Sequence, residues 1–211
     1  LVIVAALIGC LISNQLVASR SYHALLDVEE GDFTEDVYSI SFEEIPSLDS
    51  SSASELGTRA LGELSDIVSQ YEIEELYTQI NYHGVPVRVA SLKYGDIFKW
   101  VTNQKNGLPG YVMVNMVTQQ AAVVRLGEGI RISPSERFNR DLTRTLRFRY
   151  PTYIFDTPHL EINEDGDPYW ICPRVDKKIG LFGGTDIVGA VIMNAVNGSS
   201  ESYNLDQIPQ W

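Results

Sequence analysis

The sequence is short of the residues that most often carry catalysis or hold metals. It has only two cysteines, Cys10 and Cys172, and three histidines, His23, His83 and His159, which lie far apart in the chain. Cysteines so placed cannot supply a disulfide framework or a paired-cysteine zinc motif, and there is no His-Glu-x-x-His run. A Gly-x-Ser-x-Gly elbow is also missing. We therefore expect no catalytic residue, no metal and no cofactor.

Basic residues are scarce and unevenly placed. The chain of 211 residues has 16 Lys and Arg against 28 Asp and Glu, which gives a formal net charge of −12. So acidic a chain is a poor candidate for nucleic-acid binding. Between residues 21 and 80 the only Lys or Arg is Arg59, whereas residues 131–149 hold six arginines and two acidic residues. These oppositely charged regions either pair within the fold, or the basic one faces an anionic partner.

The first residues form the longest apolar run of the chain. Residues 1–12 are apolar apart from Gly9, and the apolar character resumes after residues 13–15. Because about 20 apolar residues span a bilayer as a helix, we predict a transmembrane anchor at residues 1–20, with the chain beyond it extracytoplasmic. A cleaved signal peptide, with a small-residue site at residues 17–19, is one alternative. A lipoprotein signal ending at Cys10 is another, and all three place the following domain outside the cytoplasm.

Two capping patterns predict helices beyond the anchor. Residues 21–50 are acidic and are predicted to form a mostly extended connector. A serine at position 52 with a glutamate three residues later predicts a helix over residues 52–71. Ser133, followed by a proline and Glu136, predicts the start of a second long helix that ends before Pro151. On this helix Arg137, Arg140, Arg144 and Arg147 would share one face, and we predict that these four arginines contact a partner.

Alternating apolar residues and turn clusters predict antiparallel strands around these helices. A short helix is predicted at residues 94–103. The expected strands cover residues 76–82, 85–92, 111–117, 121–126, 153–155, 160–162, 168–175, 187–195 and 201–205. The fold class is therefore α+β, with an N-terminal transmembrane helix followed by tandem helix-plus-sheet units at residues 51–128 and 129–211. The second unit is expected to be truncated at its C-terminal end.

A faint internal repeat supports the tandem arrangement. Residues 111–120 and 190–198 each contain a strand, an asparagine within it (Asn115 and Asn194), and a turn leading to a further strand. The run Val191-Ile192-Met193-Asn194-Ala195-Val196-Asn197-Gly198 resembles the closing hairpin of PepSY-type domains. The chain as a whole is similar to extracytoplasmic parts of uncharacterised membrane proteins of Gram-positive anaerobes, notably at residues 146–151, 168–171 and 179–184.

The resemblance implies binding, inhibition or sensing in the cell envelope instead of catalysis. We predict a membrane-tethered, extracytoplasmic, non-enzymatic domain that contacts an envelope protein or an anionic polymer. A PepSY-type domain that restrains an envelope peptidase is the first alternative. The non-catalytic part of an envelope hydrolase completed by residues beyond Trp211 is the second.

Overall fold

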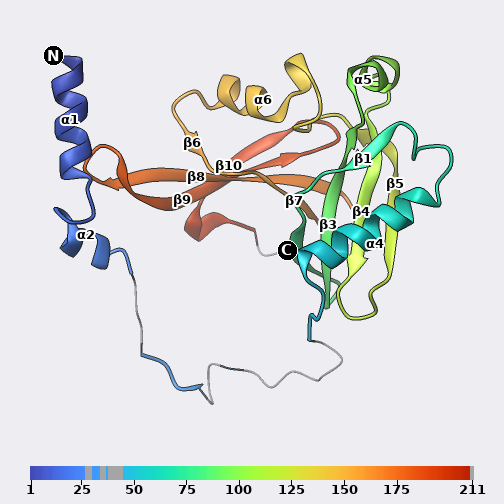
Figure 1. Ribbon diagram of the computed structural model, residues 1–211, viewed down its shortest axis with the longest axis horizontal. Coiled ribbons are helices and arrows are strands. Elements are labelled where there is room, and N and C mark those ends of the chain that lie inside the picture. The colour runs from blue at the N-terminus through green and yellow to red at the C-terminus, as the bar shows by residue number, and fades with distance from the viewer. Residues whose placement is uncertain (27–29, 34–36, 38–44, 210–211) are drawn as a thin grey trace.

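The protein has an α+β fold with two antiparallel sheets, which confirms the predicted class (Figure 1). The computed structural model describes residues 1–26, 30–33, 37 and 45–209. The helices are α1 (Val2–Ile12), α2 (Ser19–His23), α4 (Ser50–Gly62), α5 (Ile97–Asn103) and α6 (Leu142–Arg149), with 3-10 turns η2 (Phe138–Arg140) and η3 (Leu205–Gln207). The strands are β1 (Tyr71–Ile73), β2 (Thr78–Tyr82), β3 (Val85–Tyr94), β4 (Leu108–Asn115), β5 (Ala121–Ile130), β6 (Ile154–Phe155), β7 (His159–Ile162), β8 (Pro168–Ile179), β9 (Gly183–Asn194) and β10 (Ser200–Asn204).

The two sheets have the same strand order. In the first, β1, β3, β4 and β5 are neighbours in that order and β2 also pairs with β3. In the second, β6, β8, β9 and β10 follow one another and β7 also pairs with β8. Each sheet therefore has one long strand that pairs with two short strands along one edge and with the next strand in the sequence along the other.

The equivalence extends to single hydrogen bonds at the ends of β4 and β9. The side-chain oxygen of Asn115 accepts bonds from the backbone amides two and three residues further on, at 2.9 and 2.8 Å. Asn194 does the same at 3.0 and 2.9 Å. The residue after each asparagine donates its amide to a proline carbonyl at 3.0 Å, that of Pro86 or of Pro168. The relation between these two segments that the sequence indicates is thus confirmed in their geometry.

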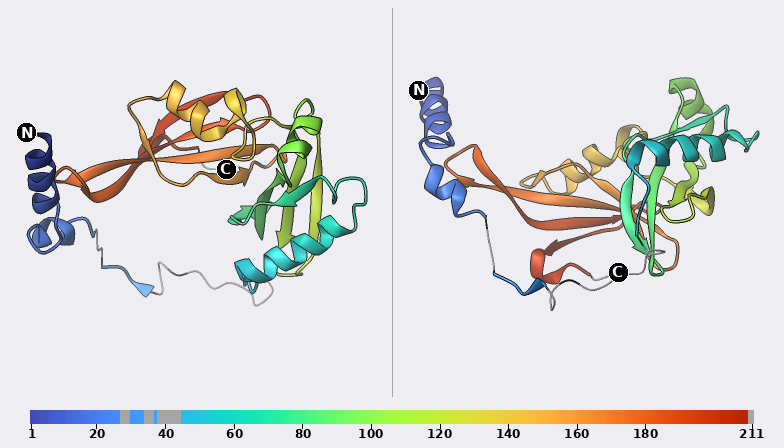
Figure 2. Two further views of the ribbon diagram at one scale, coloured as in Figure 1. Left: turned by 45° about the horizontal axis from the view of Figure 1, so that its top comes forward. Right: turned by 60° about the horizontal axis from the view of Figure 1, so that its bottom comes forward.

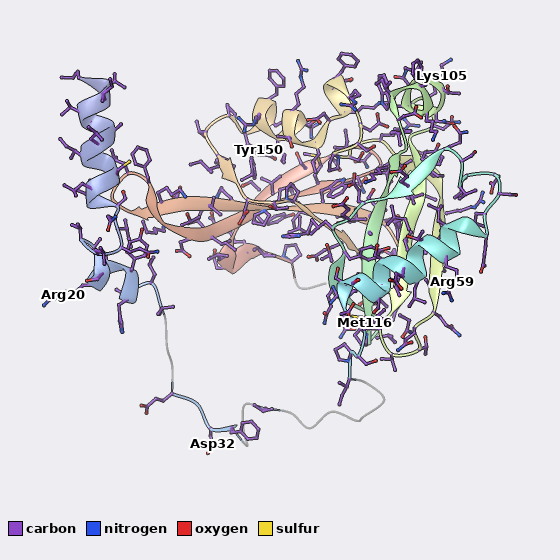
Figure 3. The ribbon with its side chains drawn as sticks, viewed as in Figure 1. Arg20, Asp32, Arg59, Lys105, Met116 and Tyr150 are labelled. Atoms are coloured by element: carbon purple, nitrogen blue, oxygen red, sulfur yellow. The ribbon has the colours of Figure 1, made fainter. Side chains whose placement is uncertain are left out.

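One continuous core joins the two sheets. Helix α4 lies along the first sheet and α6 along the second (Figures 1 and 2). The hydroxyl of Tyr111 in β4 donates to the carbonyl of Gly166 at 3.1 Å, and the indole of Trp170 in β8 donates to the carbonyl of Ile132 at 2.7 Å. Tyr150, labelled in Figure 3, links the end of α6 to β10 through a 3.2 Å hydroxyl contact with Ser200.

The N-terminal region differs from its prediction. Helix α1 ends at Ile12, and in the described part of the chain no helix is both long enough and apolar enough to cross a bilayer. The transmembrane helix predicted at residues 1–20 is therefore not supported. The polar residues after Ile12 end the helix. The Ser13 hydroxyl accepts the backbone amide of Leu181, and the Asn14 side chain accepts the amide of Leu16. Much of the predicted connector at residues 21–50, namely residues 27–29, 34–36 and 38–44, lies outside the described residues.

Helices α4 and α6 each begin at an aspartate that the capping patterns of the sequence do not include. Asp49 caps α4 by accepting the amide of Ser52 at 2.7 Å, and α4 ends at Gly62, so the prediction of a helix to residue 71 is wrong. Asp141 caps α6 by accepting the amide of Arg144 at 2.7 Å, so the predicted helix start at Ser133 is also wrong. An aspartate at this position satisfies an otherwise unpaired amide of the first turn.

Candidate functional site

A hollow of about 850 Å³ lies between α5, η2 and α6. It combines apolar and aromatic side chains with three of the four arginines singled out from the sequence. Its lining residues are Ile97, Trp100, Arg137, Phe138, Asp141, Thr143, Arg144, Arg147 and Phe148. No other cavity described in the protein gathers arginines in this way, so we treat this arginine–aromatic hollow as the candidate functional site.

A buried glutamate fixes the wall that α5 contributes. Glu136 is only 1% exposed and accepts the Tyr94 hydroxyl at 2.7 Å and the Trp100 indole at 3.0 Å. The hydroxyl oxygen of Ser133 accepts the backbone amides of Ser135 and Glu136, each at 3.2 Å. Ser133 therefore accepts amides as a helix N-cap would, but no helix follows it. The Glu136 side chain points into the core, where it binds Tyr94 and Trp100.

The electrostatics of this cluster favour a neutral phenol beside Glu136. Burial raises the pKa of Tyr94, and the hydrogen bond to Glu136 raises it further. Burial and the same carboxylate also raise the pKa of Tyr71, whose ring lies 5.6 Å from that of Tyr94. Both tyrosines therefore keep their protons at any physiological pH, and Tyr94 remains a donor to Glu136.

Helix α5 is secured at both of its ends. Asp96 accepts the amides of Phe98 at 2.9 Å and Lys99 at 3.0 Å, and these bonds hold the pKa of its carboxyl below the usual value. At the other end the guanidinium of Arg140 donates to the carbonyl of Gln104. The wall of the hollow is therefore built from short elements that side chains lock together.

The aromatic rim of the hollow is exposed. Phe138 is 68% and Phe148 75% exposed, and Phe138 lies 6.0 Å from the Trp100 ring between centroids. Phe138 has a positive φ of 57°, which aims an aromatic side chain outward from a strained turn. The guanidinium of Arg144 lies 5.6 Å from the Phe148 ring centre, within the range of a cation–π contact.

The three arginines of the hollow have no acidic partner among the residues that the structure describes. Among the described residues neither Arg137, Arg144 nor Arg147 forms an ion pair, although the chain as a whole is acidic. The one carboxylate in the lining belongs to Asp141, which is engaged by the first turn of α6. The sequence left open whether this basic region pairs with the acidic region of the chain. Within the described residues, these three side chains form no such pair.

The structure brings three of the four predicted contact residues together and directs the fourth elsewhere. They do not form one helical face, because α6 begins only at Leu142, and Arg140 turns towards Gln104. Arg137, Arg144 and Arg147 nevertheless meet in the hollow. Trp100, Phe138 and Phe148 were not singled out in advance. Phe138 and Phe148 are exposed, on the η2 turn and on α6, whereas Trp100 is buried on the short helix α5, and the sequence gives no periodic signal for these positions.

No cluster of three or more His, Cys, Asp or Glu side chains suited to a metal occurs among the described residues. His83 contacts Glu164 at 2.9 Å between two surface turns. Cys172 is fully buried, and burial raises the pKa of its thiol to about 12, so it is not a nucleophile at neutral pH.

Comparison with known proteins gives no relative, because no family model, curated protein or solved structure matches the chain.

Proposed function

We propose that the protein is a non-enzymatic binding domain that works outside the cytoplasm at a membrane and uses the arginine–aromatic hollow to bind an acidic protein segment. The observation that carries this proposal is the meeting of three guanidinium groups, none of them in an ion pair with a described residue, with exposed aromatic rings. Arginine and aromatic side chains are enriched at the energetic centres of protein interfaces. A segment that offers carboxylates and one or two apolar side chains fits both features.

Membrane association is supported by the character of α1. Helix α1 contains no charged residue, and most of its large side chains face solvent. Among them Val2 is 82%, Leu7 65% and Leu11 61% exposed. Apolar side chains gathered in this density mark a surface that meets lipid or another protein.

A PepSY-type regulatory domain that restrains an envelope peptidase is the second candidate. The observation that favours it is the repeated helix-and-sheet plan, with the same asparagine turn closing β4 and β9. In this case the acidic segment in the hollow would belong to the peptidase. Inhibition of a co-expressed envelope protease by the purified protein tests this reading.

The binding proposal is tested with labelled peptides and fluorescence anisotropy. The probe is a fluorescein-labelled peptide that alternates Glu with Phe and Leu, compared with a Glu–Ser peptide and a Lys–Phe–Leu peptide. The double variant Arg144→Glu/Arg147→Glu is expected to bind the first probe at least about tenfold more weakly, since each lost charge-assisted contact is worth about 1.5–3 kcal/mol. The Lys–Phe–Leu peptide is expected to bind least to the wild-type protein.

The matched control is Arg59→Glu/Lys178→Glu, which makes the same change in net charge on surfaces remote from the hollow. Arg59 lies on α4, and Lys178 is at the far end of β8 (Figures 1 and 3). Equal loss of binding in both double variants would show that only overall charge matters, and the hollow would then not be the site. Absence of binding by the wild-type protein would contradict the proposal itself.

A further inference from the structure

We propose that the turn between β8 and β9 is a second lipid-contacting element, which enters the interface of an anionic bilayer side by side with α1. This inference rests on the membrane association proposed above. It assigns the lipid surface to two elements that are about 170 residues apart in the sequence, and it gives a role to Leu181 and Phe182 at the tip of the β8–β9 hairpin.

The tip of the hairpin is held to α1 by specific hydrogen bonds. The hydroxyl oxygen of Ser13, directly after α1, accepts the backbone amides of Leu181 at 3.1 Å and Phe182 at 3.0 Å. The hydroxyl of Tyr22 in α2 donates to the carbonyl of Ser13 at 2.8 Å. All three views place α1 and α2 at this end of the hairpin and away from the other strands of both sheets (Figures 1 and 2).

Close packing accompanies these bonds. Gly9 is the only buried residue of α1, and a Cβ atom placed there would lie 2.7 Å from the Phe182 ring and 2.8 Å from the Leu181 side chain. A larger residue at this position would force the Leu181 and Phe182 side chains to shift, so the glycine permits the tip to lie this close to the helix. The hairpin and α1 therefore present their apolar side chains as one surface.

Most of that surface is open to solvent. Leu181 is 57% and Phe182 53% exposed, even though both touch α1. The side chains that continue the surface along α1 and the following turn are at least 43% exposed: Leu1, Val2, Ile3, Val4, Leu7, Ile8, Leu11, Ile12, Leu16 and Val17. A patch of this size on an otherwise acidic protein needs a cover, and a lipid surface supplies one.

The charges around the patch select an anionic bilayer as that cover. Residues 1–26 contain no Asp or Glu, and the hairpin has none between Asp176 and Asp186. Arg20 on α2 and the exposed Lys177 and Lys178 on β8 border the patch instead. Basic side chains just behind an apolar tip sit at the depth of lipid headgroups, where they gain from anionic lipid.

The test places an environment-sensitive NBD label on the hairpin tip. The full chain carrying Cys10→Ser and Leu181→Cys is labelled and mixed with vesicles of phosphatidylcholine and phosphatidylglycerol, or of phosphatidylcholine alone. Cys172 stays unlabelled because it is buried. A label at Thr58→Cys on α4 is the control position. We expect a blue shift and quenching by brominated lipid for the tip label with the anionic vesicles, and neither effect for the α4 label.

A second measurement uses vesicle flotation without labels. Leu181→Ser/Phe182→Ser is expected to weaken binding to anionic vesicles by about tenfold or more, since it removes two large apolar side chains from lipid. The matched control Phe98→Ser/Val101→Ser removes two side chains on α5 that are 80% and 55% exposed, and it is expected to bind like the wild-type protein.

The possible results separate the inference from the function on which it rests. If the wild-type protein floats with vesicles while the tip label stays in water and the tip variant binds normally, membrane association stands and the inference is wrong. If the wild-type protein does not float, both are wrong. If the tip label becomes shielded without vesicles as protein concentration rises, the patch is a contact between copies of the chain, and the inference is overturned.

Discussion

The carboxylate of Glu136 accepts the indole N–H of Trp100 at 3.0 Å, so that a turn ahead of η2 fixes the position of α5 across the hollow. Its other oxygen accepts the hydroxyl of Tyr94 at 2.7 Å. With 1% exposure Glu136 is among the most buried polar residues described. A single carboxylate thereby joins the first sheet, α5 and the segment leading to α6.

Replacement of this carboxylate is expected to destabilise the fold strongly. Glu136→Ala leaves two buried donors without acceptors, and we expect a loss of about 2–4 kcal/mol in the free energy of unfolding. Urea denaturation followed by far-UV circular dichroism measures the loss. Glu136→Gln retains one acceptor oxygen and is expected to lose less.

A double-mutant cycle with Trp100→Phe isolates the bond itself. The two residues are expected to be coupled by about 1–3 kcal/mol, because the phenyl ring removes the donor that Glu136→Ala would otherwise strand. Additive effects of the two substitutions would mean that the 3.0 Å contact contributes nothing to stability.

The repeated asparagine turns predict matching effects in the two sheets. Asn115→Ala and Asn194→Ala each remove two side-chain to backbone bonds, and each is expected to cost about 1–3 kcal/mol. Asn→Asp at either position keeps the accepting oxygen and serves as the control. A difference above about 1 kcal/mol between the two alanine variants would contradict the equivalence of the turns.

The two cysteines are expected to differ in reactivity. Cys10 is exposed on α1, whereas Cys172 is fully buried in β8 with its thiol pKa raised to about 12 by burial. A thiol titration of the native protein with Ellman's reagent should therefore count one reactive group, and titration in urea should count two. After Cys10→Ser the native protein should show none. Fast reaction of that variant would show that β8 opens readily.

Glu161 in β7 predicts a pH effect of defined sign. Burial raises its pKa above the ordinary value of 4.5, and the positive charge of His159 only partly opposes this. The folded protein thus holds this proton more tightly than the unfolded chain, so the contribution to stability is complete below the unfolded pKa and is lost as the pH rises through the folded one.

Urea midpoints measured from about pH 4 to about pH 7 test this effect in the wild-type protein and in Glu161→Gln. The amide cannot ionise, so the decline in stability with rising pH is expected to be smaller in the variant. A decline of the same size in both proteins would assign the pH dependence to other groups.

Local signals in the sequence predict the compact hairpins well. The alternation on both sides of residues 83–84 predicts β2 and β3, and both turn residues have the positive φ that a tight turn requires, 52° at His83 and 79° at Gly84. The Asn163 turn between β7 and β8 likewise forms, because the side-chain oxygen of Asn163 accepts the backbone amides of Asp165 and Asp167, at 3.1 and 2.7 Å.

The length of the β8–β9 hairpin and the start of α6 depend on contacts between residues that are distant in the sequence. The β8–β9 hairpin extends well beyond the predicted strands at residues 168–175 and 187–195, because its outer part is a two-stranded ribbon with no core to impose alternation. The second helix was predicted too early because Ser133 and Glu136 match a capping box. Partners in β3 and α5, which the pattern does not contain, direct Glu136 inward.

The length of the β8–β9 hairpin sets a distance. Its strands have 12 residues each and remain paired from Tyr169 and Asn194 to Ile179 and Gly183. At about 3.3 Å per residue each strand measures about 40 Å, and its outer part, beyond Val175, pairs with no strand other than its hairpin partner. The outer end of the hairpin is hydrogen-bonded to Ser13, directly after α1, and its inner end is part of the second sheet. Whatever surface receives α1, the outer part of this hairpin therefore holds the rest of the second sheet, and the arginine–aromatic hollow beside α6, away from that surface.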